Sequence, residues 1–338
     1  MERGAYVLAG DIGGTKTHLG LFVKGRGRPR IKALQTYSSR HTPDIETIIE
    51  SFLERYPHPI AGACLGIAGP IIRGRSHITN LCLEVSETAL QKRFGWPHVR
   101  LINDLIATAH GLSLLNHSEL FPLNSRKIRS KENRALVAPG TGLGVAFIVC
   151  ENRICSPVAS EGGHMDFAPG SEDEWDLFKF LSQRYGHVSI ERVLTGAGLH
   201  NIYQWLLSKK RYREPKWLQE GMREMDPAEA ISNCALKHKD PLCIASLERF
   251  VSILGAVAGN MALIAMATGG VYLGGGIAPK ILPMLKESLF IRSFVNKGRY
   301  KPFMEKIALR VILNDKTALM GAAHVALQHI ARLGCIRV

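Results

Sequence analysis

The segment from Tyr6 to Val23 constrains the fold of this chain more than any other. An apolar run from Tyr6 to Ala9 leads into Gly10-Asp11, a tight Gly13-Gly14-Thr15 turn follows, and alternating apolar residues then return. The pattern predicts a strand, a glycine turn and a second strand, which together form a hairpin within one sheet. Glycines let the backbone N–H groups of such a turn face an anion. Taken alone, the pattern fits an ordinary Gly-Gly hairpin equally well.

A second copy of this pattern lies from Ala135 to Val149, with the turn Gly140-Thr141-Gly142-Leu143-Gly144 between two apolar runs. A repeat of this kind, about 130 residues along the chain, indicates a duplicated unit. We expect the two glycine loops to face each other across a cleft. Asp11, at the end of the first strand, is suited to hold a hydrated Mg2+ that accompanies nucleotide phosphates.

The composition is typical of a soluble globular enzyme, with 46% hydrophobic and 21% charged residues in 338. This length predicts about two domains. The first strand begins by Tyr6, so we expect no N-terminal signal. The seven cysteines show no paired metal-ligand spacing. We therefore expect reduced thiols and a cytoplasmic location.

The net charge of +14 is the most unusual bulk property. The basic residues gather in four short segments, 24–32, 126–134, 209–213 and 292–310, which are expected to be loops and helix ends. No nucleic-acid-binding motif accompanies them, so we expect no nucleic-acid partner. A positive field would instead attract anionic nucleotides.

Residues 250–279 carry no charge and could be read as a membrane span. Thr268-Gly269-Gly270 interrupts this segment, and Val271–Leu273 then has the character of a short strand. We therefore expect a buried helix followed by a core strand, and no membrane partner. Small residues along the helix, Gly255 and Gly259 among them, would let it pack closely beneath a ligand.

The first part of the chain has the alternation of an α/β layer structure. After the first hairpin we expect strand 31–37, helix 42–56, strand 61–67, helix 87–94, strand 99–102 and helix 105–115. Ligands bind at the carboxyl ends of the strands in such sheets. Asp11, Gly69 and the pair Asn103-Asp104 all fall at those ends.

We expect a small α/β domain over residues 1–115, completed by the C-terminal helix 317–338, and a large α/β domain over residues 116–316. The large domain holds the second hairpin, the loop 160–169 and a series of further elements. These are helices 172–185, 191–207 and 227–238, the long apolar helix, strand 271–273, a Gly274-Gly275-Gly276 turn and a helix from Pro279.

Six motifs, in order, resemble those of the bacterial glucokinase family, which belongs to the sugar kinase, actin and Hsp70 superfamily. They are GDIGGT at 10–15, IND at 102–104, GTGLG at 140–144, EGGH at 161–164, ERVLTGAGL at 191–199 and GGGI at 274–277. The resemblance continues to NDKTALMGAA at 314–323 and so covers nearly the whole chain. It implies a two-domain, actin-like ATPase (ribonuclease H-like) fold with an interdomain cleft.

The activity implied by this resemblance is the ATP-dependent phosphorylation of D-glucose at its 6-hydroxyl, the first step of glycolysis. ATP and Mg2+ are then required, and a homodimer is common among such enzymes. Asp104 matches the catalytic base. The sugar contacts match Asn80, Asn103, Asp104, Glu161, His164 and Glu191. The nucleotide contacts match Gly10, Asp11, Ile12, Gly13, Gly14, Thr15, Gly140, Thr141, Gly142, Gly144, Gly274, Gly275 and Gly276, and Asp11 would hold Mg2+ through water.

Each of these residues also has a purely structural interpretation. Asn103 or Asp104 could simply cap the helix that follows, and Glu191 could be a first-turn acid of its own helix. His164 could be a satisfied core histidine, although Gly162-Gly163 before it favours a ligand loop. Lys16 could contact a phosphate or face solvent.

The identity of the substrate is the least constrained part of the prediction. Gly69 in IAGP stands where some family members carry another small residue, and the aromatic residue often found after Thr79-Asn80 is missing. Another hexose, an amino sugar or a polyphosphate donor therefore remains open, as does a sugar-sensing protein without turnover. A related kinase and repressor family shares EGGH but carries a cysteine-rich zinc cluster after it, whereas no cysteine lies between Cys155 and Cys234 here.

Overall fold

The computed structural model divides the chain into two compact units and describes residues 5–14, 16–39, 44–78 and 83–332. Unit 1 comprises Met1–Asn116 and Asn314–Val338, and unit 2 comprises His117–Leu313. Thr15 and Asn80, two of the predicted site residues, lie outside the described residues, as does the Thr42-Pro43 start of the first predicted helix.

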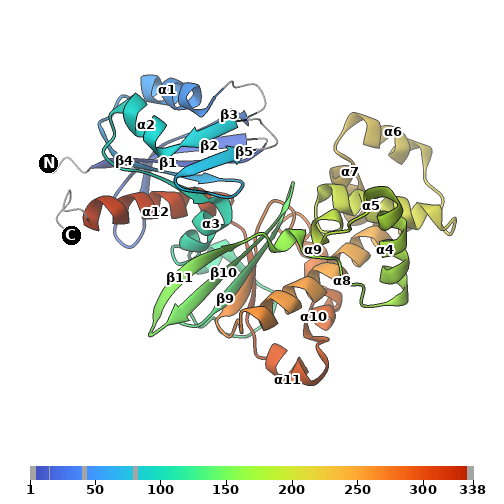
Figure 1. The fold of residues 1–338 in the computed structure, drawn as a ribbon. Helices are drawn as coiled ribbons and strands as arrows, with labels where there is room; N and C mark the ends of the chain where they lie inside the picture. The colour runs from blue at the N-terminus through green and yellow to red at the C-terminus, as the bar shows by residue number, and fades with distance from the viewer. Residues whose placement is uncertain (1–4, 15, 40–43, 79–82, 333–338) are drawn as a thin grey trace. The chain divides into compact units, whose positions relative to one another are not determined.

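Unit 1 is built on a five-stranded sheet in the order β3-β2-β1-β4-β7. Figure 1 labels β1, β2, β3 and β4 of this sheet. The strands are β1 (Tyr6–Ile12), β2 (Lys16–Val23), β3 (Arg30–Ser38), β4 (Ile60–Ile67) and β7 (Val99–Asn103). A separate hairpin pairs β5 (Arg75–Ile78) with β6 (Leu83–Ser86). The helices are α1 (Ile45–Arg55), α2 (Glu87–Phe94), α3 (Asp104–Leu112) and α12 (Thr317–Arg332).

Both faces of this sheet are covered, because its central strands are apolar on both sides. Leu8 and Ile12 of β1 pack with residues of α1 and α2, whereas Val7 and Ala9 pack with α3 and α12. Helices α3 and α12 approach each other very closely. A Cβ on Gly321 would lie 1.8 Å from the Ala107 carbonyl oxygen, so only glycine fits there.

Unit 2 is built on a six-stranded sheet in the order β11-β10-β9-β12-β13-β8. The strands are β8 (Leu120–Pro122), β9 (Arg134–Pro139), β10 (Leu143–Glu151), β11 (Ile154–Ser160), β12 (Gly270–Leu273) and β13 (Leu309–Ile312). The helices are α4 (Glu172–Tyr185), α5 (Gly196–Ser208), α6 (Lys216–Glu224), α7 (Pro227–Asn233), α8 (Pro241–Ile264), α9 (Leu282–Leu285), α10 (Ser288–Val295) and α11 (Lys301–Met304). A π-helix over Cys234–His238 follows α7.

The two sheets share one topology. In each, three consecutive antiparallel strands (β1 to β3, and β9 to β11) are followed by two strands that add in parallel beside the first (β4 and β7, and β12 and β13). Each glycine segment forms a hairpin within its own sheet, as predicted. The α/β layer order predicted for the first part of the chain is also confirmed.

Several elements depart from the prediction. The helix expected from Glu191 begins only at Gly196, and Glu191 lies instead in a short 3-10 turn, Ile190–Arg192. The β5-β6 hairpin and the strands β8, β11 and β13 were not predicted. The residues of β11 alternate little in hydrophobicity and include Pro157, which a strand tolerates at a sheet edge.

The uncharged segment forms the buried helix α8 followed by the core strand β12, as predicted. By length and composition, α8 is the one helix among the described residues that could cross a membrane, and 67% of its most apolar window is buried in the protein. Its glycines Gly255 and Gly259 allow close packing against α10. A Cβ on Gly255 would lie 2.4 Å from the Phe290 carbonyl oxygen of α10.

The expectation that all cysteines are reduced is wrong for one pair. Cys150 and Cys155 lie opposite each other on β10 and β11 and form a disulfide. The short turn between the two strands brings these residues together, a contact that sequence spacing alone did not reveal. Cys64, Cys234 and Cys243 are free and buried.

Candidate active site

Among the described residues, unit 1 gathers its predicted site residues toward the carboxyl ends of three parallel strands. The Ala68 N–H after β4 donates to the Ile12 carbonyl at the end of β1, at 3.1 Å. The Asn103 Nδ2 at the end of β7 donates to the Gly69 carbonyl, at 3.3 Å. These bonds hold the three strand ends side by side, which is where ligands bind in parallel sheets.

Asn103 is the N-cap of α3. Its Oδ1 accepts from the Leu105 N–H at 2.9 Å and from the Ile106 N–H at 3.2 Å, so Asn103 does cap this helix. Asp104 is the first residue of α3 and accepts from the Leu105 N–H through Oδ1, at 2.8 Å. The cap therefore positions the first turn of α3, including Asp104, beside the strand ends.

Asp11 and Asp104 form a pair of interacting carboxylates. Desolvation first, and the charge of Asp104 second, raise the pKa of Asp11 to about 7. Two acidic groups that repel each other in a partly buried setting are a suitable donor set for a divalent cation, which would relieve that repulsion. The residues present therefore fit a Mg2+ ion held at Asp11.

The first glycine turn is closed by the Gly13 N–H, which donates to the Lys16 carbonyl at 3.0 Å. Lys16 itself is exposed at the first position of β2. Gly10 lies inside β1 rather than in the turn. A Cβ there would lie 2.6 Å from Leu65 Cδ2, so packing within the sheet accounts for this glycine.

In unit 2 the second glycine turn lies against two further segments. The Gly140 N–H donates to the Gly142 carbonyl at 2.9 Å, and the Gly140 carbonyl accepts from the Gly196 N–H, which opens α5, at 3.1 Å. Gly275 has a positive φ of 72°, and a Cβ there would lie 2.3 Å from the Pro139 carbonyl oxygen. Glycine is thus required at Gly275 so that the Gly274–Gly276 turn can lie against the end of β9.

Glu191 faces the same turn. Its Oε2 accepts from the Leu143 N–H at 2.9 Å, across 48 positions of sequence. The loop carrying Glu161 and His164 also contacts Leu143, since a Cβ on Gly163 would lie 2.1 Å from the Leu143 carbonyl oxygen. The backbone of Leu143 therefore joins both the turn that carries Glu191 and the loop that carries Glu161 and His164 to the glycine turn.

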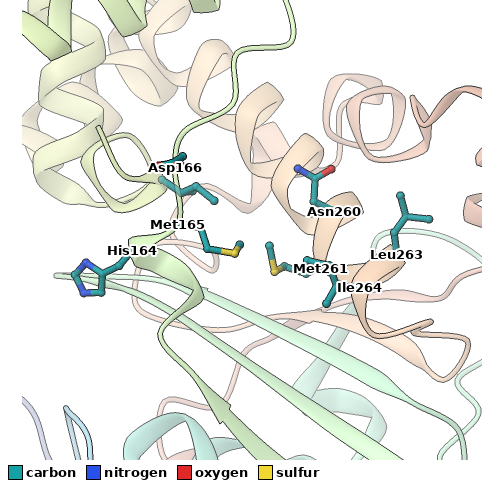
Figure 2. Close-up of a pocket in the computed structure, with 8 residues that line it drawn as sticks. His164, Met165, Asp166, Asn260, Met261, Leu263 and Ile264 are labelled. Atoms are coloured by element: carbon teal, nitrogen blue, oxygen red, sulfur yellow. The ribbon is translucent and has the colours of Figure 1, made fainter. Parts of the chain in front are cut away.

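Glu161 and His164 are exposed, so the interpretation of His164 as a core histidine is wrong. His164 lies at one end of a pocket of about 690 Å³ within unit 2. Figure 2 shows the sulfurs of Met165 and Met261 pointing toward one another across this pocket, while the His164 imidazole points away from it. Of the predicted sugar contacts in unit 2, only His164 lines this pocket; Glu161 and Glu191 do not.

The structure thus brings the predicted residues together as two groups, one in each unit. The group of unit 1 contains Gly10, Asp11, Ile12, Gly13, Gly14, Asn103 and Asp104. The group of unit 2 contains Gly140, Thr141, Gly142, Gly144, Glu161, His164, Glu191, Gly274, Gly275 and Gly276.

Sequence reasoning missed three residues that hold the segments of the unit 2 group together. Leu143 acts through its backbone, which carries no signal in the sequence, and Gly163 was noted only as a loop glycine. Thr195 caps α5, accepting from the Gly198 N–H at 3.0 Å, and donates to the Glu191 carbonyl at 3.0 Å. A threonine before a glycine-rich helix start is a cap signal that could have identified it.

Comparison with known proteins identifies the family. The sequence model of the family described as Glucokinase matches residues 8–329. The chain belongs to the glucokinase family. A glucokinase from Nostoc punctiforme is 39% identical over 332 residues, which cover 94% of this chain and 97% of that protein.

Solved structures agree with this assignment. A glucokinase from an Antarctic psychrotroph has a TM-score of 0.83 at 29% identity, over 96% of this chain and 99% of that one. A ROK family glucokinase from Streptomyces griseus, solved in complex with glucose and AMPPNP, has a TM-score of 0.66 at 20% identity, over 96% and 100%. The second match shows the fold alone. The α/β fold and the resemblance to glucokinases predicted from the sequence are both confirmed.

Proposed function

We propose that the protein is a glucokinase that transfers the γ-phosphoryl group of ATP to the 6-hydroxyl of D-glucose, giving glucose 6-phosphate and ADP. In a chain of the glucokinase family, one observation carries the proposal. Asp11 and Asp104 interact at the carboxyl ends of β1 and β7, beside a glycine turn. Phosphoryl transfer needs this combination, because it depends on charge neutralisation, alignment and a proton acceptor.

Asp104 would accept the proton of the 6-hydroxyl. Its place in the first turn of α3 favours the ionised carboxylate, and the bond from the Leu105 N–H fixes its orientation. A base in this position contributes about 10²- to 10⁴-fold to the rate. Asn103, Glu161, His164 and Glu191 would bind the sugar hydroxyls. A site that depends on such polar contacts rejects analogues lacking them.

The backbone N–H groups of residues 10–15 and 140–144 would bind the phosphates, and Gly274–Gly276 the adenosine side. Asp11 would hold Mg2+ through water, and this ion would supply neutralisation of phosphate charge when bound. Asn80 and Thr15 are proposed as ligand contacts by resemblance to the family alone.

The two units would be the two domains of an actin-like kinase, with one half of the site on each side of an interdomain cleft. Water is a competing acceptor, so closure around glucose is expected before transfer. We place the enzyme in the cytoplasm, as a homodimer that acts at the start of glycolysis. Small-angle scattering with and without saturating glucose tests closure, and an unchanged radius of gyration contradicts it.

The activity itself is tested with purified protein, Mg2+ and a panel of sugars, scored for ADP release. Glucose should give the highest kcat/KM with ATP. An amino sugar or another hexose that exceeds glucose would reassign the substrate, and turnover with polyphosphate alone would reassign the donor. Absence of ADP release with every sugar, despite glucose binding, would identify a sugar sensor instead.

A further inference from the structure

A second cluster of reactive side chains lies in unit 2, outside the candidate active site. It consists of Cys234, Asp240 and Cys243, whose Sγ and carboxylate oxygen atoms all lie within 4.8 Å of one another. Both cysteines are almost completely buried, with exposed fractions of 1% and 0%. Among the described residues this is the one group of three such ligand atoms. The proposed phosphoryl transfer uses none of them.

An unusual local backbone builds this cluster. The chain leaves α7 through the π-helix Cys234–His238 and then turns at Lys239, which has a left-handed φ of 60°. The Lys239 N–H donates to the Cys234 carbonyl at 2.9 Å, which closes the turn. Asp240 then caps α8 by accepting from the Cys243 N–H at 3.0 Å. Short π-helices often occur at functional sites, and left-handed lysines are uncommon.

Two sulfurs and one carboxylate are a ligand set for a borderline-soft divalent cation. Zinc binds thiolates at about 2.3 Å, so two sulfurs on one tetrahedral zinc lie roughly 3.8 Å apart. Because the ligand atoms of this cluster lie within 4.8 Å of one another, that geometry requires a shift of about 1 Å or less. We propose that Cys234, Asp240 and Cys243 bind a thiophilic divalent cation of the zinc class, with water in a fourth position.

Two thiolates and a carboxylate around a dipositive ion leave one net negative charge, and Lys237 and Lys239 flank the cluster in sequence. Burial raises the pKa of both thiols. A thiophilic cation binds thiolates, so its binding would release the protons of both thiols. Cys64 is also buried and free, but it belongs to no comparable group among the described residues.

The ion would have a structural role. It would join the π-helix to the first turn of α8, the helix that fills the core of unit 2. An ion that binds the folded protein but not the unfolded chain stabilises the fold by mass action. A saturating ion would therefore raise the Tm by on the order of 5 °C.

The test uses the full-length, reduced protein and Co2+ as a spectroscopic probe, followed by displacement with Zn2+. We expect one equivalent of Co2+ per chain, with the near-ultraviolet charge-transfer band of thiolate ligation, and loss of that band on adding Zn2+. Cys234→Ala and Cys243→Ala should each abolish the band. Cys64→Ala and the double variant Cys150→Ser/Cys155→Ser should bind like the parent.

Asp240→Asn keeps the proposal testable if the cysteine variants fold poorly, because the asparagine oxygen can still cap α8. This variant should keep its circular dichroism spectrum and bind Co2+ at least about tenfold more weakly, since a charged ligand is lost. Absence of the charge-transfer band in the parent would overturn the proposal. Unchanged binding in Asp240→Asn would overturn it equally.

Discussion

The Glu191 carboxylate accepts a hydrogen bond from the Leu143 N–H, at 2.9 Å, and so links a proposed sugar contact directly to the second glycine turn. The contact is close enough that a Cβ on Gly142 would lie 2.9 Å from Glu191 Oε2. One side chain thus serves both the turn and the sugar in the proposed mechanism. Sugar binding at Glu191 would therefore affect the phosphate-binding turn through the hydrogen bond to Leu143.

Two substitutions at Glu191 should separate these roles. Glu191→Gln keeps an acceptor for the Leu143 N–H, so the KM for ATP should stay near its original value while the KM for glucose rises. Glu191→Ala leaves that N–H without its partner, at a cost of about 1–3 kcal/mol, so kcat/KM for ATP should also fall by about 10- to 100-fold. Steady-state kinetics checks both, with the exposed Glu220→Ala as a control. Equal changes in kcat/KM for ATP in the two variants would contradict the link between Glu191 and the second glycine turn.

Gly163 should be intolerant of any side chain. A Cβ would lie 2.1 Å from the Leu143 carbonyl oxygen, and backbone must shift to relieve the clash. We expect Gly163→Ala to lower the free energy of unfolding by about 2–4 kcal/mol and to reduce activity. Gly221→Ala is the control. No heavy atom lies within 4 Å of a Cβ there. Gly221→Ala in this helix should therefore raise the free energy of unfolding by about 0.5–1 kcal/mol. Denaturant unfolding distinguishes the two.

Asp11→Asn should stabilise the metal-free protein while destroying its activity. The pKa of Asp11 is raised from 3.8 to about 7 in the folded state. Its favourable contribution to folding is therefore complete below pH 3.8 and is lost as the pH rises through 7.

The advantage of Asn over Asp should accordingly grow between pH 4 and 7, reach roughly 1–3 kcal/mol, and stay constant above pH 7. Thermal unfolding in EDTA measures it, with the exposed Glu54→Gln as a control. A lower Tm for Asp11→Asn at pH 8 would mean that the carboxylate supports the fold rather than a cation.

His110 should make unit 1 sensitive to mild acid. Burial, and secondarily the charge of His324, lower the pKa of His110 from 6.5 to about 4. Its contribution to stability is therefore present above pH 6.5 and is lost as the pH falls from 6.5 to 4. As the pH falls from 6.5 to 4, the free energy of unfolding of His110→Gln should therefore decrease by roughly 1–2 kcal/mol less than that of the parent. Urea unfolding at pH 7 and pH 5 tests this, with the exposed His117→Gln as a control that should match the parent.

The sequence was sufficient for those parts of the fold that depend on local patterns. The hairpins β1-β2 and β9-β10 follow from period-2 apolar runs around glycine turns. Helix α2 ends where Gly95 adopts a left-handed φ of 66°, and α4 begins where Ser171 caps it. Each of these signals lies within a few residues of the element that it defines, so sequence reasoning could find it.

The sequence was insufficient where a contact joins distant backbone atoms. The Leu143 N–H has no side-chain signature, so its bond to Glu191 could not be predicted. The Cys150–Cys155 disulfide depends on a strand register, and the cluster of Cys234 with Cys243 depends on a π-helix. Neither is visible from residue spacing. The roles of the two groups of site residues thus remain predictions from the sequence and the family.

The central claim is that Asp104 removes the proton from the sugar hydroxyl, and one variant tests it most directly. Asp104→Asn keeps an oxygen that can accept from the Leu105 N–H, so the start of α3 should be preserved. Measured beside the exposed Asp315→Asn, it should lower kcat by at least about 10²-fold while glucose still binds in calorimetry. A variant that keeps a tenth of the parent's kcat would contradict the assignment of Asp104 as the base.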